Sequence, residues 1–150
     1  MKHRLLYLFP ILLVLLSSCF NNKTAAPAST TTVPSGTFTG QFRLLRFSKK
    51  TGAYDTLSAN IMLTMETSTG YKVTGDTSTI QAGSYGDYGI STLNSNIVFQ
   101  DKTYPTTGTP TKTHLNGQYQ YQYDGTTLQM VANSALDTLS LQYNLTKTGN

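Results

Sequence analysis

Few residues in this chain could perform acid–base or nucleophilic chemistry, and His114 is the first to consider. It is the only histidine beyond the first three residues. A serine hydrolase would need it as the general base, with an acid such as Asp101 and a nucleophile such as Ser84 or Ser91. Neither serine lies in a nucleophile motif. His114 follows a threonine-rich loop, where we expect a solvated side chain. We therefore predict no catalytic residue, and we expect that the protein is not an enzyme.

The seven carboxylates form no recognisable metal-binding or catalytic motif. Most of them lie in predicted turns, where an aspartate bonds to nearby backbone groups. None shows the spacing of a calcium loop, and one histidine with one cysteine cannot supply a transition-metal site. A pair of carboxylates for glycoside hydrolysis would leave no sequence signal, because their separation is set in three dimensions. We predict no metal and no cofactor.

Tyrosines offer another kind of chemistry, which is contact with a ligand. Tyr119, Tyr121, Tyr123 and Tyr143 fall on one predicted face. A buried tyrosine hydroxyl usually needs a hydrogen-bond partner. Several inward hydroxyls are easier to satisfy in a cavity with water or ligand than in a dry core. Two alternatives are that these rings pack at a rim with their hydroxyls in solvent, or that they stack on sugar rings.

The segment from Leu115 to Leu145 positions these tyrosines. Apolar or aromatic residues alternate with polar ones on both sides of Asp124-Gly125, a pair that favours a two-residue hairpin turn. The register that follows places Tyr123, Tyr121 and Tyr119 opposite Thr126, Leu128 and Met130. A second turn, at residues 133–136, places Ala132, Met130 and Leu128 opposite Asp137, Leu139 and Leu141.

The rest of the domain also alternates with period two, and no segment keeps a helical period. Strands are predicted at residues 37–47, 57–66, 88–92 and 96–101. A loop at Ser68-Thr69-Gly70 places Thr67, Met65 and Leu63 opposite Tyr71, Val73 and Gly75. Residues 102–113 form a loop longer than a hairpin needs, and such loops are often functional or mobile. The count is eight strands, which predicts an all-β, antiparallel up-and-down barrel without exposed edges, with a β-sandwich as the alternative.

The N-terminus predicts export and a lipid anchor. Lys2 and Arg4 precede an apolar run, Leu5–Leu16, that is shorter than the roughly 20 residues of a membrane span. Leu16-Ser17-Ser18-Cys19 resembles the bacterial lipobox, in which Cys19 receives lipid and becomes the first residue; the alternative is an ordinary secretory signal. We therefore predict a signal peptide at 1–18, a lipidated flexible tether at 19–35 and a barrel at 36–150.

The predicted partners follow from this anchor and from the charge. Without Lys2 and Arg4, nine basic and seven acidic residues remain, a net charge of +2. These charges are spread out, so we predict no nucleic-acid binding. The acyl chains would hold the protein on a membrane, and we expect a monomer. Phe20 follows Cys19 where an aspartate would resemble an inner-membrane retention signal, so the outer membrane is favoured, with its face left open.

Several segments together resemble a family, the small lipocalin-like lipoproteins of Bacteroidetes. Besides the lipobox, they are GTFTGQFRLLRF, YKVTGDTSTIQAG, TYPTTGTPTKTHLNGQY and the closing YDGTTLQM and DTLSLQYNLTK. The resemblance implies a calycin-like barrel of eight strands on a lipid anchor. The chain has no tryptophan, so Gly40-Gln41-Phe42 stands where better-known lipocalins have Gly-x-Trp.

The leading functional hypothesis is a binding module that holds a small apolar or amphipathic molecule inside the barrel. A barrel of eight strands is just wide enough to be filled by side chains or to hold one small ligand. Burial of apolar ligand surface would drive binding, and tyrosine hydroxyls would add polar contacts. The predicted ligand-binding residues are Leu63, Met65, Val73, Tyr119, Tyr121, Leu128, Met130, Leu141 and Tyr143. The alternative is a non-catalytic structural or interaction lipoprotein of the cell envelope with a filled barrel.

Overall fold

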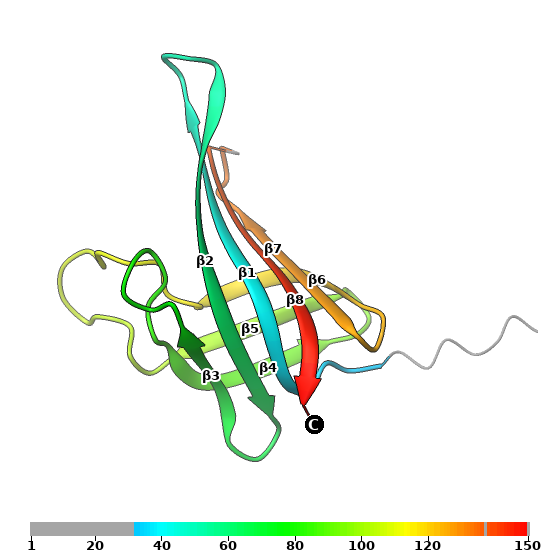
Figure 1. Cartoon of the computed structure of the whole chain (residues 1–150). Helices are drawn as coiled ribbons and strands as arrows, with labels where there is room; N and C mark the ends of the chain where they lie inside the picture. Colours follow the sequence, from blue (N-terminus) through cyan, green and yellow to red (C-terminus); the bar gives the residue numbers. More distant parts are fainter. Residues whose placement is uncertain (1–31, 137, 150) are drawn as a thin grey trace, which may run out of the picture. The chain divides into compact units, whose positions relative to one another are not determined.

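The computed structural model describes residues 32–136 and 138–149, which form an all-β domain (Figure 1). The predicted signal peptide, Cys19 and most of the predicted tether lie outside the described residues. The strands are β1 (Gly36–Ser48), β2 (Ala53–Glu66), β3 (Gly70–Gly75), β4 (Tyr85–Ser91), β5 (Asn96–Asp101), β6 (Gly117–Tyr123), β7 (Thr127–Asn133) and β8 (Leu139–Gly149). In this part of the chain, no helix is long and apolar enough to cross a membrane.

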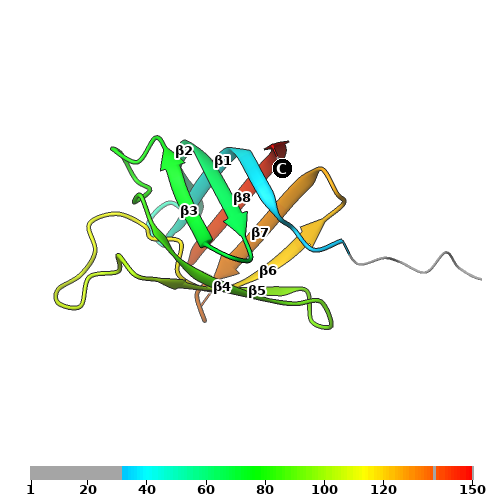
Figure 2. The same ribbon diagram turned by 90° about the horizontal axis from the view of Figure 1, so that it is seen from below.

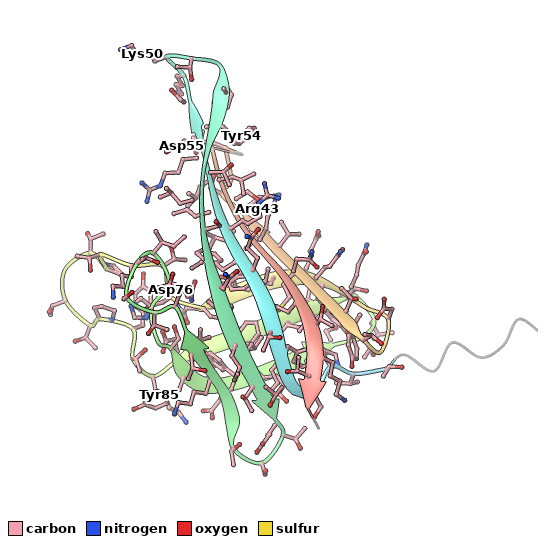
Figure 3. All side chains as sticks on the ribbon, in the orientation of Figure 1. Arg43, Lys50, Tyr54, Asp55, Asp76 and Tyr85 are labelled. Carbon is pink, nitrogen blue, oxygen red and sulfur yellow. The ribbon has the colours of Figure 1, made fainter. Side chains whose placement is uncertain are left out.

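Each strand pairs antiparallel with the next, and β8 pairs with β1 to close a barrel. The predicted eight-stranded up-and-down barrel is therefore confirmed. β4 and β5 run at a steep angle to β1, β2 and β8, as the two views show (Figures 1 and 2). The far end of the β1–β2 hairpin extends beyond the other strands and carries Lys50 near its tip (Figure 3).

Alternation in the sequence explains which face of each strand is buried. In β2, the even-numbered residues from Asn60 to Glu66 are exposed or half-buried, whereas Ile61, Leu63 and Met65 are buried. The same alternation in β6 buries Tyr119 and Tyr121 and exposes the glutamines between them. Successive side chains of a strand point to opposite faces, so one face of this sheet forms the core and the other the outer surface.

The hairpin registers predicted from the sequence are wrong by even numbers of residues. Tyr121 lies opposite Met130, not Leu128, and Met65 lies opposite Tyr71, not Val73. Met130 lies opposite Tyr143, a shift of four from the predicted Leu139. Because each shift is even, every side chain still lies on its predicted face.

The turn at Asp124 shows the physical cause. The Asp124 carboxylate accepts hydrogen bonds from the N–H groups of Thr126, at 2.8 Å, and Thr127, at 2.6 Å. Gly125 adopts a positive φ of 98° within this turn. The turn spans Asp124 to Thr127 because the aspartate side chain, rather than a two-residue backbone turn, satisfies these N–H groups.

Closure of the barrel depends on a close approach at Gly40. A Cβ atom on Gly40 would overlap the carbonyl oxygen of Asn144 on β8 and lie 2.9 Å from the Cα of Leu145. Both neighbours are backbone atoms of a paired strand, so they cannot rotate away. Gly89 on β4 contrasts with it, because a Cβ there would meet no atom within 4 Å.

We predict that Gly40→Ala lowers the free energy of unfolding by about 1–3 kcal/mol, since overpacking forces the paired backbones apart. Urea denaturation followed by circular dichroism measures the change. Gly89→Ala is the matched control and should stay within about 0.5 kcal/mol of the parent. Equal effects of the two substitutions would contradict the close approach of β1 and β8.

Candidate functional site

All nine residues that the sequence assigned to an internal ligand site lie on the inner face of the barrel. Eight are no more than 6% exposed, and Leu141 is partly buried and packs against the core. The predicted inner face is therefore confirmed. That these residues hold a ligand stays a prediction.

A chain of contacting aromatic rings crosses the interior. The ring centroids lie 4.8 Å apart for Tyr71 and Phe99, 5.8 Å for Phe99 and Tyr119, 5.6 Å for Tyr119 and Tyr143, and 4.9 Å for Tyr143 and Phe42. The five residues come from β3, β5, β6, β8 and β1, so the contacts link neighbouring strands and also strands that do not pair with each other. The first three pairs meet edge to face, an arrangement that aromatic rings favour. These aromatic side chains thus pack against one another within the core.

A glutamine from the β3–β4 connection adds to this packing. Gln81 is fully buried, and the Tyr143 hydroxyl donates a hydrogen bond to its Oε1 atom at 3.2 Å. Gln81 also forms an isolated bridge with Thr113. Thr113 lies in the long loop between β5 and β6, residues 102–116, and its carbonyl accepts a hydrogen bond from the Ala82 N–H at 2.8 Å. The β3–β4 connection and the long loop are therefore paired with each other beside the core.

The tyrosine hydroxyls in the core differ in their partners. Tyr71 donates to the Leu115 carbonyl at 2.5 Å, and Tyr143 donates to Gln81. The Tyr121 hydroxyl is buried without a hydrogen-bond partner in the described structure. The buried Tyr119 hydroxyl interacts with the Tyr143 hydroxyl and the Asn116 backbone, but not with the geometry of an ordinary hydrogen bond. Burial raises the pKa of Tyr119 to about 12; burial and the neighbouring Tyr119 raise the pKa of Tyr143 well above its usual range. Tyr119 and Tyr143 therefore stay neutral at physiological pH and can act only as hydrogen-bonding or packing groups.

A cavity of about 640 Å³ lies on the outer face of the barrel, where β6, β7, β8 and β1 are neighbours. Its volume falls within the usual range of ligand sites, roughly 300–1,000 Å³. Tyr121, Met130 and Tyr143 contribute to its floor. Since these three residues are at most 6% exposed, the outward residues on either side of them supply the reachable side chains.

Those outward side chains form a grid of two rows, which we call the amide grid. One row contains Gln122, Gln129, Asn144 and Gln41, in which each residue is the register partner of the next. The other row contains Gln120, Val131, Gln142 and Arg43, paired in the same way. All eight line the cavity. The grid therefore follows directly from the pairing of four consecutive strands.

The turn between β4 and β5 forms a wall of the same cavity. Asn94 and Ser95 line it, and the Ser95 carbonyl accepts a hydrogen bond from the Tyr121 N–H at 2.8 Å. Ser95 has a φ of 50°, in the left-handed region that residues other than glycine seldom adopt. The bond to β6 holds the turn in this conformation at the edge of the grid.

Sequence reasoning missed the amide grid although its signal was present. In Gln118–Tyr123 the glutamines alternate with the tyrosines, so the pattern that buries the rings also places every glutamine outside. The rest of the grid could not be found in this way, because Gln41 is distant in sequence and joins the row only through the pairing of β1 with β8.

The prediction that His114 is solvated is wrong. Its side chain is 11% exposed, and its Nδ1 atom lies 2.6 Å from Oδ2 of Asp101, whose side chain is fully buried. The Tyr104 ring packs against the imidazole with centroids 5.3 Å apart, and the Asn116 side-chain oxygen accepts a bond from the Asp101 N–H at 3.1 Å. The long loop returns to its own starting point, so these bonds fasten its two ends together.

The Asp101 carboxylate is strongly hydrogen-bonded. Burial alone would raise the pKa of Asp101, but bonds from the hydroxyl and N–H of Thr103, at 2.6 and 2.8 Å, and from His114 outweigh it. The net result is a pKa below the ordinary value. Asp101 is therefore ionised at neutral pH and orients the imidazole.

An oriented histidine needs a nucleophile to do hydrolytic chemistry, and the two candidate serines are placed differently. Ser84 is fully buried; its hydroxyl accepts the Leu115 N–H at 3.1 Å and donates to the Ala82 carbonyl at 3.5 Å. Ser91 ends β4, and neither serine hydrogen-bonds to His114 among the described residues. The structure thus joins Asp101 to His114 but does not complete a triad. The described ranges also contain no group of three or more metal-ligating side chains.

Comparison with known proteins does not assign this chain to a family. No protein-family model, no curated protein and no solved structure matches the chain. Arguments about function therefore rest on the residues and contacts described above.

We predict that Asp101→Asn lowers the free energy of unfolding at pH 7 by about 1–3 kcal/mol, because the amide cannot replace a carboxylate that accepts three hydrogen bonds. A lowered folded-state pKa means that the contribution is fully present above the ordinary aspartate pKa of about 3.9 and is lost as the pH falls through the lowered value. Urea unfolding at pH 7, 5 and 3 should show the difference from the parent shrinking at the lowest pH.

The control is Asp87→Asn. Asp87 bonds to Lys102 at 2.9 Å, with both side chains more than half exposed, so its loss should cost less than about 0.5 kcal/mol. A difference for Asp101→Asn that stays constant with pH would contradict the assignment of an ionised, buried Asp101.

Proposed function

We propose that this protein is a lipid-anchored, non-catalytic binding module of the cell envelope, whose barrel is a filled scaffold and whose ligand binds on the outer face. The anchor is Cys19, and the outer membrane is the proposed location. The single observation that supports this function best is the chain of aromatic rings from Phe42 to Tyr71 across the interior. These rings pack within a core of buried side chains, so in this proposal the barrel contributes rigidity and the ligand binds at its surface.

The described cavities agree with this division of roles. Four that the described residues line, of about 640, 460, 360 and 250 Å³, all include exposed side chains and so open at the surface. The largest of these four is the one over the amide grid. A rigid sheet holds side chains in fixed positions more precisely than loops do, which suits a surface that recognises a polar ligand.

The absence of a completed triad among the described residues supports the non-catalytic part of the proposal. The Asp101–His114 pair already has a structural role, because it fastens the long loop to the end of β5. The resemblance to lipocalin-like lipoproteins supports the anchored barrel, but it names no ligand. The proposed partners are thus a membrane, through the lipid, and a molecule that meets the outer face.

A second candidate is a small amphipathic molecule inside the barrel. One observation favours it, which is that the Tyr121 hydroxyl is buried without a hydrogen-bond partner in the described structure. Leaving such a group unsatisfied costs about 1–3 kcal/mol, and a polar atom of an internal ligand would remove that cost.

One pair of substitutions separates the two candidates. In a filled barrel we predict that Tyr121→Phe leaves the free energy of unfolding unchanged or raises it by about 1 kcal/mol, since it removes an unsatisfied hydroxyl. Tyr143→Phe is the matched control; it leaves Gln81 Oε1 without its donor and should cost about 1–3 kcal/mol. Urea denaturation measures both changes.

Native mass spectrometry of the purified, lipidated protein completes the test. The filled barrel predicts the mass of the lipidated polypeptide alone. A small molecule bound in stoichiometric amount, together with a loss of stability in Tyr121→Phe, would contradict the proposed function and support the internal site.

A further inference from the structure

We propose that the amide grid binds an acidic carbohydrate chain, laid across β6, β7, β8 and β1. The inference rests on the proposed function, because that function places binding on the outer face. It adds the chemical class of the ligand and the side chains that recognise it.

The grid presents amide side chains that are free to bond with a ligand. Each amide offers two N–H donors and a carbonyl acceptor, which matches a sugar hydroxyl, itself both donor and acceptor. Gln142 donates to the Ser140 hydroxyl at 3.3 Å. The other five amides of the grid make no side-chain hydrogen bond within the part of the chain that the structure describes. They are solvated and can exchange water for ligand hydroxyls.

A further polar atom beside the grid lacks a partner. Asn96 on β5 is the register partner of Gln120, so both point outward. The Asn96 Oδ1 atom is buried without a hydrogen bond in the described structure. An acceptor left open next to Gln120 is a position where a ligand hydroxyl or a bridging water would gain a bond.

The dimensions of the grid suit an extended chain. Neighbouring strands lie about 4.8 Å apart, so a row that crosses four strands spans about 14 Å. In the row from Gln122 to Gln41, an amide recurs at every strand. A linear saccharide presents hydroxyls at regular intervals along its length, and such a repeating ligand can bond to each amide in turn.

Charge indicates that the saccharide is acidic. Among the residues that the structure describes, Arg43 is the only charged one that lines the cavity, and no carboxylate lines it. Figure 3 shows Arg43 on β1, away from the tip of the β1–β2 hairpin that carries Lys50. Arg43 forms no ion pair within the described residues, and a guanidinium can bond to a carboxylate or sulfate through two parallel N–H groups. One arginine at the end of an amide row thus selects one acidic group on a hydroxyl-rich chain.

Other occupants fit the site less well. Nucleic acid binding needs several cations along a backbone and exposed aromatic rings for stacking, whereas the grid has one cation and its tyrosines are buried. A peptide strand needs a free sheet edge, and the four strands under the grid each pair with a neighbour on both sides. An apolar ligand would displace water from the eight residues of the grid without replacing their hydrogen bonds, because only Val131 among them is apolar.

The composition of the whole chain fits the same chemistry. Only 12% of its residues are charged, about half the usual share. The grid itself presents six amides and a single guanidinium. A surface of this kind bonds to hydroxyl-rich polymers without the strong attraction that would bind any polyanion.

The test measures binding of defined oligosaccharides to the full-length chain in detergent by isothermal titration calorimetry. The acidic probes are hexagalacturonate, a hyaluronate hexasaccharide and a heparin hexasaccharide; maltohexaose is the neutral probe and hexaglutamate the non-sugar polyanion. We expect at least one acidic saccharide to bind, maltohexaose to bind more weakly and hexaglutamate not to bind.

Three variants locate the site. Gln129→Ala, in the middle of the amide row, should weaken saccharide binding about tenfold, which corresponds to the loss of one well-formed hydrogen-bonded contact. Arg43→Gln keeps a hydrogen-bonding side chain but removes the charge, so it should reduce acidic saccharides to the affinity of the neutral one. Gln100→Ala is the matched control, because Gln100 is exposed on β5 and does not line the cavity; it should change nothing. Circular dichroism melting confirms that each variant folds.

The outcomes separate this inference from the proposed function. Failure of all three acidic saccharides to bind, equal binding of hexaglutamate, or binding that Gln129→Ala leaves intact would overturn the amide-grid assignment alone. A small molecule that co-purifies inside the barrel, seen by native mass spectrometry, would instead overturn the proposed function on which it rests.

Discussion

Pairing of β1 with β8 closes the sheet, and the rest of the structure depends on it. A closed sheet has only an inside and an outside, and successive residues of each strand must alternate between them. The close approach at Gly40, where only a hydrogen fits against the β8 backbone, allows this pairing. Without closure, Gln41 and Arg43 would have no neighbours on β8, and the amide rows would end at that strand. Closure of the barrel thus determines both which residues form the core and which residues form the candidate site.

The fold class and the face of each strand that is buried were predictable from the sequence, because both depend on a period of two residues. β5 has its predicted bounds, β4 begins at Tyr85 rather than at the predicted residue 88, and the inward direction of Tyr119, Tyr121 and Tyr143 was predicted correctly. The pairing partners were not. A slip of two or four residues keeps every apolar side chain on the core face, so the hydrophobic pattern carries no information on it. Register was decided by turn chemistry, such as the two backbone N–H groups that Asp124 holds.

The candidate site was predictable only in part, for two different reasons. The fixed His114 side chain was missed because its partner, Asp101, precedes a loop whose path the sequence does not specify. That path is set by tertiary bonds, including the bridge between Gln81 and Thr113. The amide grid was missed because polar residues on alternate positions are what any solvated sheet face would show. They become a candidate site only when four strands are known to be neighbours and a cavity lies over them.

The inner and outer faces of the barrel therefore have different roles. Aromatic rings that meet across the interior make the scaffold rigid, and outward amides on the same strands meet the ligand. The most direct test is an NMR titration of the full-length chain with the acidic hexasaccharide that binds best, observing side-chain amide and core methyl resonances together. Our account predicts shifts confined to the amides of the grid, including Gln129 and Asn144, while the methyls of Leu63, Met65 and Leu128 stay unchanged. Shifts of those core methyls with unchanged grid amides would contradict it.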